Sequence, residues 1–330
     1  MNDPVHIPAK PKENNALHAR AVVFERPKSL CLADVNLTAP GADDVVVDVD
    51  YSGISTGTER LLWTGNMPPF PGLSYPLVPG YETVGTIVDA GADSKQRIGE
   101  SVFVSGANCY GDDVRGLFGG SASRVVVKSD KALRLPDSLG QQGTLLALAA
   151  TALHTMNVNA ETTPPDLIVG HGVLGRLLAR VAMARGADAP TVWELDAKRR
   201  DGATGYCVMH PDDDPRRDYR AIYDVSGDAN IVDSIVDRLA PSGEVVLAGF
   251  YDRVSFAFPA AFMREMRLRI AAEWKPEDLL EVQSLIASEK LVLDGLITHI
   301  VPATEAENAY DTAFGDPMCL KMVMDWRELR

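Results

Sequence analysis

Three closely spaced glycines and one acid carry the clearest chemical pattern in the sequence. Gly170, Gly172 and Gly175 form GxGxxG within DLIVGHGVLGRLLARV, after a short β-branched run and before an amphipathic one. Glycines at these positions allow a tight turn and bring backbone amides close to a diphosphate, whose charge the following helix N-terminus favours. The next predicted strand, TVWE, ends in Glu194, at a spacing where an acid accepts hydrogen bonds from ribose hydroxyls. The pattern predicts a dinucleotide site.

The residues around this loop also bear on the choice of cofactor. Glu194 would repel a 2′-phosphate and favours NAD, whereas Arg199 and Arg200 could recruit that phosphate and would favour NADP. We predict NAD. His171 is interpreted as a loop residue without a catalytic role. The residues predicted to bind the cofactor are Thr151, Gly170, Gly172, Val173, Leu174, Gly175, Glu194, Arg199, Ser226, Gly249 and Phe250.

A second group of reactive side chains lies in the N-terminal half. In LVPGYETVGTIVDAG, Tyr81 and Glu82 are adjacent where a turn leads into a predicted strand, and SGISTGTE supplies Ser55, Thr56 and Thr58. Hydroxyl and carboxyl groups of this kind can move a proton. Most Tyr–Glu pairs of this type are a packed tyrosine and a capped or solvated glutamate. The residues alone therefore leave the choice between packing and chemistry open.

Two kinds of fold would position these groups. From Ala19 to about Pro136 the segments are short, β-branched and separated by glycine, which indicates an antiparallel barrel or sandwich. After Gly143, strand candidates alternate with helices such as RLLARVAMARGA and NIVDSIVDRLAP, the second ended by a proline, which predicts a parallel sheet with helices on both faces. A strand–helix–strand tail follows. We predict a disordered arm (1–18), a catalytic domain (19–145), a cofactor domain (146–290) and a return to the catalytic domain (291–330).

Composition argues against several other classes of protein. The 330 residues carry a formal net charge of -14 without a basic stripe, which argues against nucleic-acid binding. The apolar runs are too short to span a bilayer, and the N-terminal residues lack the apolar core of a signal peptide. The four cysteines are far apart, so neither a disulfide framework nor a thiolate zinc site is indicated. We expect a cytoplasmic protein without stable membrane insertion, and a homodimer is possible.

The barrel-like half, the inserted nucleotide-binding domain and the C-terminal return together resemble the medium-chain dehydrogenase/reductase superfamily. The stretches that carry the resemblance are VPGYETVG in place of a PGHE-type motif, GESVFV, GGSASRVVV, YDVSG, GEVVLAGF and ITHIVPATEAENAYDTA. From about Ala19 to Trp326, the resemblance implies an α/β fold. It consists of a GroES-like β-barrel catalytic domain and a Rossmann doubly wound parallel sheet.

The sequence departs from the zinc-using members of this superfamily. Their catalytic zinc is held by a cysteine, the histidine of GHE, and a third cysteine or acid. Here the first position is Ser55 or Thr56, the second is Tyr81 and the third is Ala147. Glu82 remains, but one carboxylate cannot replace thiolate and imidazole ligands in a tetrahedral site. The four-cysteine structural lobe is also missing, so the resemblance implies a zinc-free member without a bound metal.

The run Val49–Gly85, VDYSGISTGTERLLWTGNMPPFPGLSYPLVPGYETVG, is similar to the zinc-free dehydrogenases of bacteriochlorophyll biosynthesis. This similarity implies NAD-dependent oxidation of the 3-(1-hydroxyethyl) group of a bacteriochlorophyllide a precursor, a tetrapyrrole, to 3-acetyl. Two alternatives stay open: a zinc-free quinone or enoyl reductase that uses NADPH, and a nucleotide-binding protein without catalysis. Cofactor preference, substrate range and turnover would separate them.

Alcohol oxidation without a metal needs a group that takes up the hydroxyl proton. In the region that holds the metal in other members, the candidates are Tyr81, Thr58, Ser55, Thr56 and Glu82. Thr58 aligns with a hydroxyl that relays protons in zinc relatives. A free tyrosine has a pKa of about 10, so Tyr81 would need local tuning to act as a base.

Two of these roles have competing interpretations. His154 is a rival base, although a single histidine on the apolar helix LALAATALHTM is more often a core residue. Glu82 could orient the backbone and Arg60 without taking part in chemistry. A flat tetrapyrrole also needs a wide apolar cleft. The residues predicted to line it are Trp63, Met67, Phe70, Tyr75, Phe118, Tyr251 and Trp274.

Overall fold

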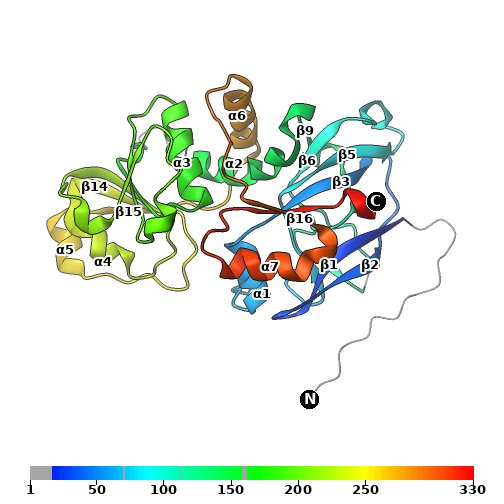
Figure 1. Cartoon of the computed structure of the whole chain (residues 1–330), viewed down its shortest axis with the longest axis horizontal. Coiled ribbons are helices and arrows are strands. Elements are labelled where there is room, and N and C mark those ends of the chain that lie inside the picture. The colour runs from blue at the N-terminus through cyan, green and yellow to red at the C-terminus, as the bar shows by residue number, and fades with distance from the viewer. Residues whose placement is uncertain (1–16, 70, 112, 158–161) are drawn as a thin grey trace, which may run out of the picture. The chain divides into compact units, whose positions relative to one another are not determined.

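The structure is a computed structural model that describes residues 17–69, 71–111, 113–157 and 162–330. The chain divides into two compact units (Figure 1). One comprises the described residues up to Leu145 together with Ile297–Arg330, and the other is Leu146–Leu296. A β-barrel-like unit and a parallel sheet confirm the predicted α/β fold class. Residues 1–16 of the predicted arm lie outside the described residues, and His18 begins a strand instead of belonging to an arm.

The first unit, here called the barrel unit, contains two sheets. One sheet has the strand order β2-β1-β4-β7, and the other has the order β16-β17-β3-β5-β6-β9, with β8 also pairing with β3. The strands are β1 (His18–Arg26), β2 (Ser29–Asn36), β3 (Asp44–Ile54), β4 (Leu77–Val78), β5 (Thr83–Ala90), β6 (Ser101–Val104), β7 (Arg115–Gly116), β8 (Arg124–Lys128), β9 (Ala132–Arg134), β16 (His299–Pro302) and β17 (Met322–Asp325). The helices of this unit are α1 (Thr58–Thr64) and α7 (Ala306–Gly315).

Strand β3 organises the barrel unit because its sequence, DVVVDVDYSGI, buries a run of valines. It pairs antiparallel with both β5 and β17, so the C-terminal tail returns to the first half of the chain. At Gly85 in β5, a Cβ would lie 2.2 Å from the Asp48 carbonyl oxygen of β3, so only glycine allows this approach. The pairing of Met322 with Ile54 brings the segment before β17 beside the turn that follows β3.

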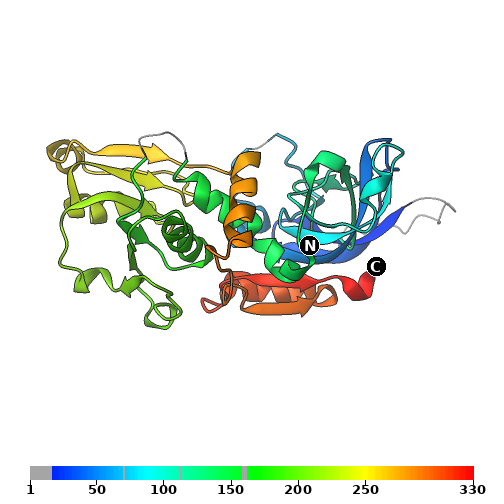
Figure 2. The ribbon, with the colours of Figure 1, turned by 90° about the horizontal axis from the view of Figure 1, so that it is seen from above.

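The second unit, here called the Rossmann unit, has one parallel sheet with the order β12-β11-β10-β13-β14-β15, which is the doubly wound dinucleotide-binding order. Figure 2 shows its strands in green to yellow. They are β10 (Leu167–Val169), β11 (Thr191–Trp193), β12 (Cys207–Met209), β13 (Tyr219–Asp224), β14 (Leu239–Leu247) and β15 (Arg267–Ile270). The helices are α2 (Leu146–His154), α3 (Val173–Ala184), α4 (Ile231–Ile235), α5 (Phe258–Met263) and α6 (Pro276–Ala287).

Two features of the fold differ from the sequence prediction. The helix predicted in NIVDSIVDRLAP is only α4 followed by one 3₁₀ turn, Val236–Arg238. It ends because β14 begins at Leu239, so the proline at position 241 does not end it. Strand β2 is not marked by a clear pattern in the sequence, since SLCLADVN mixes exposed and buried positions without clear alternation. No helix in the described part of the chain is long and apolar enough to cross a membrane.

Candidate active site

The glycine loop joins β10 to α3 in the Rossmann unit. Gly170 has a φ of 106°, a backbone conformation that residues with a side chain rarely adopt. A Cβ at Gly175, in the helix, would lie only 1.9 Å from the Gly170 carbonyl oxygen. The helix therefore packs directly on the loop. Gly172 is the N-cap of α3, and no described side chain caps it. The first amides of the helix are thus available to a diphosphate, and these residues fit a dinucleotide cofactor.

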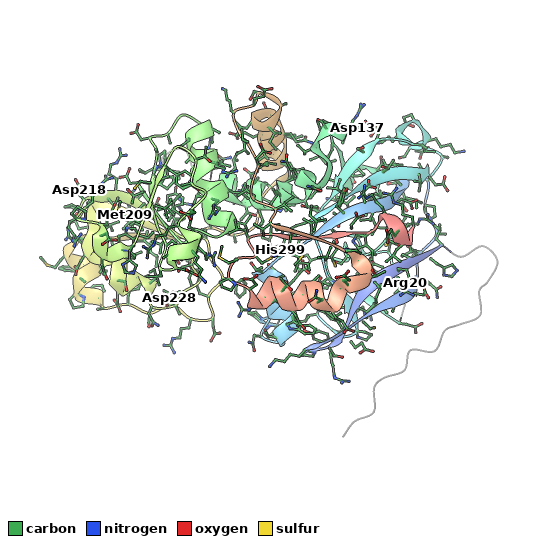
Figure 3. All side chains as sticks on the ribbon, viewed as in Figure 1. Arg20, Asp137, Met209, Asp218, Asp228 and His299 are labelled. Atoms are coloured by element: carbon green, nitrogen blue, oxygen red, sulfur yellow. The ribbon has the colours of Figure 1, made fainter. Side chains whose placement is uncertain are left out.

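Glu194 follows β11 and is fixed beside this loop. Its carboxylate accepts hydrogen bonds from the amides of His171 at 3.2 Å and Asp196 at 3.0 Å. Its own amide donates to the carbonyl of Met209, the last residue of β12, which is labelled in Figure 3. The acid therefore lies next to the glycines, as the spacing in the sequence indicates for a group that contacts ribose.

The two arginines considered for cofactor choice differ in their contacts. Arg200 donates to the carbonyls of Glu194 and Leu195, both at 2.9 Å, so its guanidinium is bonded to the backbone. Arg199 instead has its Nε 3.6 Å from the Glu194 carboxylate, and its Nη2 lies 3.0 Å from the place of a Cβ on Gly172. Of the two, Arg199 is the one that reaches the glycine loop.

The carboxyl ends of β13 and β14 carry further cofactor candidates. A Cβ on Gly170 would lie 3.4 Å from Ser226, and one on Gly249 would lie 2.6 Å from the Tyr251 hydroxyl. That hydroxyl donates to the buried carboxyl of Asp224, whose pKa is raised by burial. Tyr251, predicted for the substrate pocket, therefore lies among the cofactor candidates. The others lie at the start of α3 (Val173, Leu174), after β14 (Phe250) and within α2 (Thr151).

His154 joins α2 to α6 within the Rossmann unit. Its Nδ1 lies 2.8 Å from the Asp278 carboxylate, and its side chain is 12% exposed. Asp278 also accepts from the amide of Lys275 at 2.8 Å, at the start of α6, and from the side chain of Asn157 at 3.0 Å. These contacts give the histidine a hydrogen-bonding partner within the Rossmann unit, an arrangement that fits a core histidine on an apolar helix.

Tyr81 and Ser55 form the centre of the candidate proton-transfer site in the barrel unit. The Tyr81 hydroxyl donates to Ser55 Oγ at 2.6 Å, and its ring packs edge-on against Phe118 with centroids 5.3 Å apart. Burial and the neighbouring Glu82 raise the pKa of Tyr81, and this rise exceeds the opposing effect of the Ser55 and Thr58 hydroxyls. The phenol is therefore protonated at neutral pH. It is suited to relaying a proton and not to holding a negative charge.

Glu82 belongs to a buried ion pair that the local sequence does not reveal. Its carboxylate contacts Lys321 Nζ, and these side chains are 0% and 1% exposed. Lys321 also donates to the Ile54 carbonyl at 3.0 Å, directly before Ser55. The partner of Glu82 is thus Lys321, whereas Arg60 is exposed. Burial raises the pKa of Glu82 despite this cation.

Glu59 is a second buried acid near the same turn, and it was not among the predicted site residues. It accepts from the Ser55 amide at 3.0 Å and from the Tyr310 hydroxyl at 2.6 Å, and it is 0% exposed. Burial is the main cause that raises its pKa to about 7. The only local signal for Glu59 is its place in GISTGTE, because Tyr310 comes from the distant helix α7.

The residues of this region do not fit a catalytic zinc. The side chains at the positions of the first two zinc ligands, Ser55 and Tyr81, are hydrogen-bonded to each other through neutral hydroxyls. Glu82 is paired with a lysine, and the third position, Ala147, is apolar. Thr56 is half-buried beside Ser55. Within the described ranges, no three His, Cys, Asp or Glu side chains lie close enough together to hold a metal ion.

The aromatic loop after α1 packs against the hydrophobic core of the barrel unit. Trp63, Met67 and Tyr75 are half-buried against the hydrophobic core of the barrel unit, and the Tyr75 hydroxyl donates to the Leu62 carbonyl at the end of α1. These three residues of the predicted substrate pocket are therefore held by the core of the barrel unit, and each remains partly exposed. Phe70 lies outside the described residues. Trp274, in the Rossmann unit, is half-buried.

Comparison with known proteins agrees with this arrangement. The alcohol dehydrogenase GroES-like domain model matches residues 41–137. A solved alcohol dehydrogenase from Escherichia coli CFT073, in complex with NADH, superposes with a TM-score of 0.79 at 18% identity, covering 93% of this chain and 99% of that one. Fold and glycine loop together define a medium-chain dehydrogenase/reductase with a site for a nicotinamide cofactor.

Two curated relatives narrow this class. The chain is 54% identical to the 2-desacetyl-2-hydroxyethyl bacteriochlorophyllide A dehydrogenase of Rhodobacter capsulatus, over 95% of this chain and 100% of the relative. It is 53% identical to the protein of the same name from Cereibacter sphaeroides, over 94% and 99%. The chain belongs to this family of dehydrogenases.

Proposed function

We propose that this protein oxidises the 3-(1-hydroxyethyl) group of a bacteriochlorophyllide a precursor to a 3-acetyl group with NAD, as a step of bacteriochlorophyll a biosynthesis. The observation that carries the proposal is the 54% identity, over 95% of the chain, to the 2-desacetyl-2-hydroxyethyl bacteriochlorophyllide A dehydrogenase of Rhodobacter capsulatus. The reaction removes a hydride from the carbinol carbon and a proton from its oxygen, and a ketone is the product.

We assign the transfer of the carbinol proton to hydroxyl groups of the barrel unit. Bound NAD supplies the hydride acceptor. As the carbinol O–H breaks, Tyr81 accepts that proton on its oxygen and passes its own to Ser55 Oγ, 2.6 Å away. Ser55 then releases a proton that passes to solvent, and Thr58, whose side chain also hydrogen-bonds to Tyr81, is the other hydroxyl beside the phenol. No lasting phenolate forms, which agrees with the raised pKa of Tyr81.

The buried acids and Lys321 are assigned to positioning. Lys321 holds both the Glu82 carboxylate and the Ile54 carbonyl, and Glu59 holds the Ser55 amide. These contacts fix the turn that presents the Ser55 hydroxyl to Tyr81. The reaction proposed here uses no zinc, because the residues that replace the metal ligands are hydroxyls bonded to each other.

The preference for NAD is part of the proposal. Glu194 is fixed beside the glycine loop, where it can accept from ribose hydroxyls and repel a 2′-phosphate. Arg200, one of the two arginines considered as 2′-phosphate ligands, has its donors on backbone carbonyls. The substrate is assigned to the exposed faces of Trp63, Met67 and Phe118.

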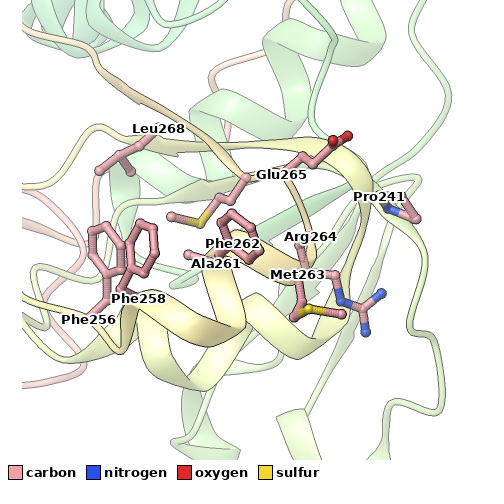
Figure 4. A pocket seen from close by; sticks show the side chains of 10 residues that line it. Pro241, Phe256, Phe258, Ala261, Phe262, Met263, Arg264, Glu265 and Leu268 are labelled. Atoms are coloured by element: carbon pink, nitrogen blue, oxygen red, sulfur yellow. The ribbon is translucent and has the colours of Figure 1, made fainter.

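We also propose that the protein is a homodimer joined at the edge of the Rossmann sheet. Strand β15 pairs with β14 and with no other described strand, and its Ile270 side chain is 65% exposed. Next to it lies a groove of about 580 Å³ lined by aromatic and aliphatic side chains, including Phe258 and Phe262 of α5 (Figure 4). A second copy could extend the sheet and cover this face. Ile270→Lys should shift the sedimenting species from dimer to monomer, whereas a monomeric unmodified protein would refute the proposal.

The cytoplasm is the location we propose, because the four cysteines are all unpaired in the structure, as in a reducing compartment. Cell fractionation with an antibody to the protein tests the location.

Function is tested by incubating the purified protein with NAD and the hydroxyethyl pigment and identifying the product by mass. A product two hydrogens lighter than the substrate supports the proposal. An unchanged pigment, with turnover of quinones or enones by NADPH, would refute it.

A further inference from the structure

His171 lies inside the glycine loop, is fully buried, and has both ring nitrogens bonded. Nδ1 lies 2.6 Å from the Arg199 carbonyl oxygen, and Nε2 lies 2.9 Å from the Tyr206 hydroxyl. Because a carbonyl oxygen only accepts hydrogen bonds, Nδ1 must carry the proton and Nε2 must accept from the tyrosine. Burial lowers the pKa of His171 to about 4, so the neutral ring keeps these roles at physiological pH.

Arg176, in the first turn of α3, bonds to the same backbone segment. Its Nε donates to the His171 carbonyl at 3.1 Å, and its Nη2 donates to the carbonyls of Arg199 at 3.0 Å and Asp201 at 2.7 Å. The Arg199 carbonyl thus accepts one hydrogen bond from His171 and one from Arg176. Since Arg176 is also buried, segment 199–201 is tied both to the glycine loop and to the helix that follows it.

This attachment determines where the Arg199 guanidinium lies. Nη2 lies 3.0 Å from the place of a Cβ on Gly172, the N-cap residue of α3, where a diphosphate would meet the free amides of the helix. Arg199 Nε is buried and has no hydrogen-bond partner among the described residues, and it faces the Glu194 carboxylate at 3.6 Å. The guanidinium therefore has donors left for an anionic ligand at the loop.

We propose that His171 is a positioning residue that holds Arg199 at the glycine loop as a ligand of the cofactor diphosphate. The inference rests on the proposed cofactor site and extends it by assigning Arg199 to the diphosphate instead of the 2′-phosphate. Because NAD and NADP share the diphosphate, Arg199 strengthens the binding of both. Glu194, and not Arg199, then determines which of NAD and NADP binds more tightly.

The test measures the dissociation constants of NAD and NADP by calorimetric titration of the full chain. His171→Phe keeps an aromatic ring at this position but removes both ring nitrogens. Arg199→Ala removes the guanidinium, and the double variant combines the two changes. Each single variant should weaken NAD and NADP by the same factor, about tenfold, on the scale of one charge-assisted hydrogen bond. The double variant should be no weaker than Arg199→Ala. His171→Asn, whose amide can donate from near the Nδ1 position, should restore most of the affinity.

A purely structural role for His171 predicts a different pattern. The double variant would then lose the summed binding free energies of the two single variants. Alternatively, His171→Phe would lower the melting temperature without changing the affinity for NAD or NADP. Either result overturns the inference, as does an Arg199→Ala variant that weakens NADP alone. If His171→Phe does not fold, Tyr206→Phe removes the partner hydroxyl and should show the same coupling to Arg199→Ala. An unmodified protein that binds neither nucleotide would refute the cofactor site itself.

Discussion

Replacing Lys321 by methionine should leave a buried carboxyl without its cation. Glu82 is 0% exposed, and its Oε1 already lacks a hydrogen-bond partner among the described residues. Removing one member of a buried ion pair costs roughly 3–5 kcal/mol, because the remaining charge is neither solvated nor paired. We therefore expect Lys321→Met to lower the free energy of unfolding by about 3 kcal/mol at pH 8. Urea unfolding followed by circular dichroism measures this loss.

The pH dependence of that loss identifies its cause. Burial already raises the pKa of Glu82 above its ordinary value, and loss of Lys321 raises it further. The folded variant then binds a proton more tightly than the unfolded chain. Its stability is highest below the unfolded pKa and falls as pH rises toward the folded pKa, by up to about 1.4 kcal/mol per pH unit. The deficit relative to the unmodified protein should thus be smaller at pH 5 than at pH 8.

Two further variants complete the test. Glu82→Gln combined with Lys321→Met removes both charges and should recover much of the stability lost in Lys321→Met alone. Lys128→Met, which removes an exposed ion pair with Asp43 and Asp44, should leave the unfolding midpoint nearly unchanged. An equal deficit at pH 5 and pH 8, or a double variant no more stable than Lys321→Met, would show that the buried charge is not the cause.

Three other changes test the proposed chemistry. Tyr81→Phe should lower turnover about a hundredfold with NAD affinity unchanged, since it removes only the relay hydroxyl; unaltered steady-state turnover would make Tyr81 a packing residue. Glu194→Ala should narrow the gap between the NAD and NADP dissociation constants, and tighter NADP binding by the unmodified protein would contradict the role of the acid. Dialysis against a chelator should leave activity intact, and a stoichiometric zinc lost together with activity, found by elemental analysis, would count against the zinc-free reaction.

Features encoded by neighbouring residues could be predicted from the sequence. The glycine loop, the acid after β11 and the strand–helix alternation depend on short-range spacing, and in the structure the Glu194 carboxylate accepts from the amide of His171 within the glycine loop. The resemblance could suggest the contact between Tyr81 and Ser55, because both residues occupy positions that hold metal ligands in the zinc-using members. The resemblance could not determine which of Ser55 and Thr56 makes the contact. The packing around the turn places Ser55 there.

Features that depend on long-range pairing could not be predicted. Lys321 and Glu82 are 239 residues apart, and they meet because β17 pairs with β3. Neither residue has a local pattern that marks it as half of a buried pair. The bond between Glu59 and Tyr310 spans 251 residues and joins α1 to α7.

The most direct test of the central claim follows one reaction in two ways. The purified protein, dialysed against a chelator, is mixed with NAD and the hydroxyethyl pigment, and NADH and acetyl pigment are quantified in the same samples. The account predicts that both products form in equal amounts at the same rate, and that Tyr81→Phe slows both together. Absence of acetyl pigment, or its formation only after zinc is restored, would contradict the account.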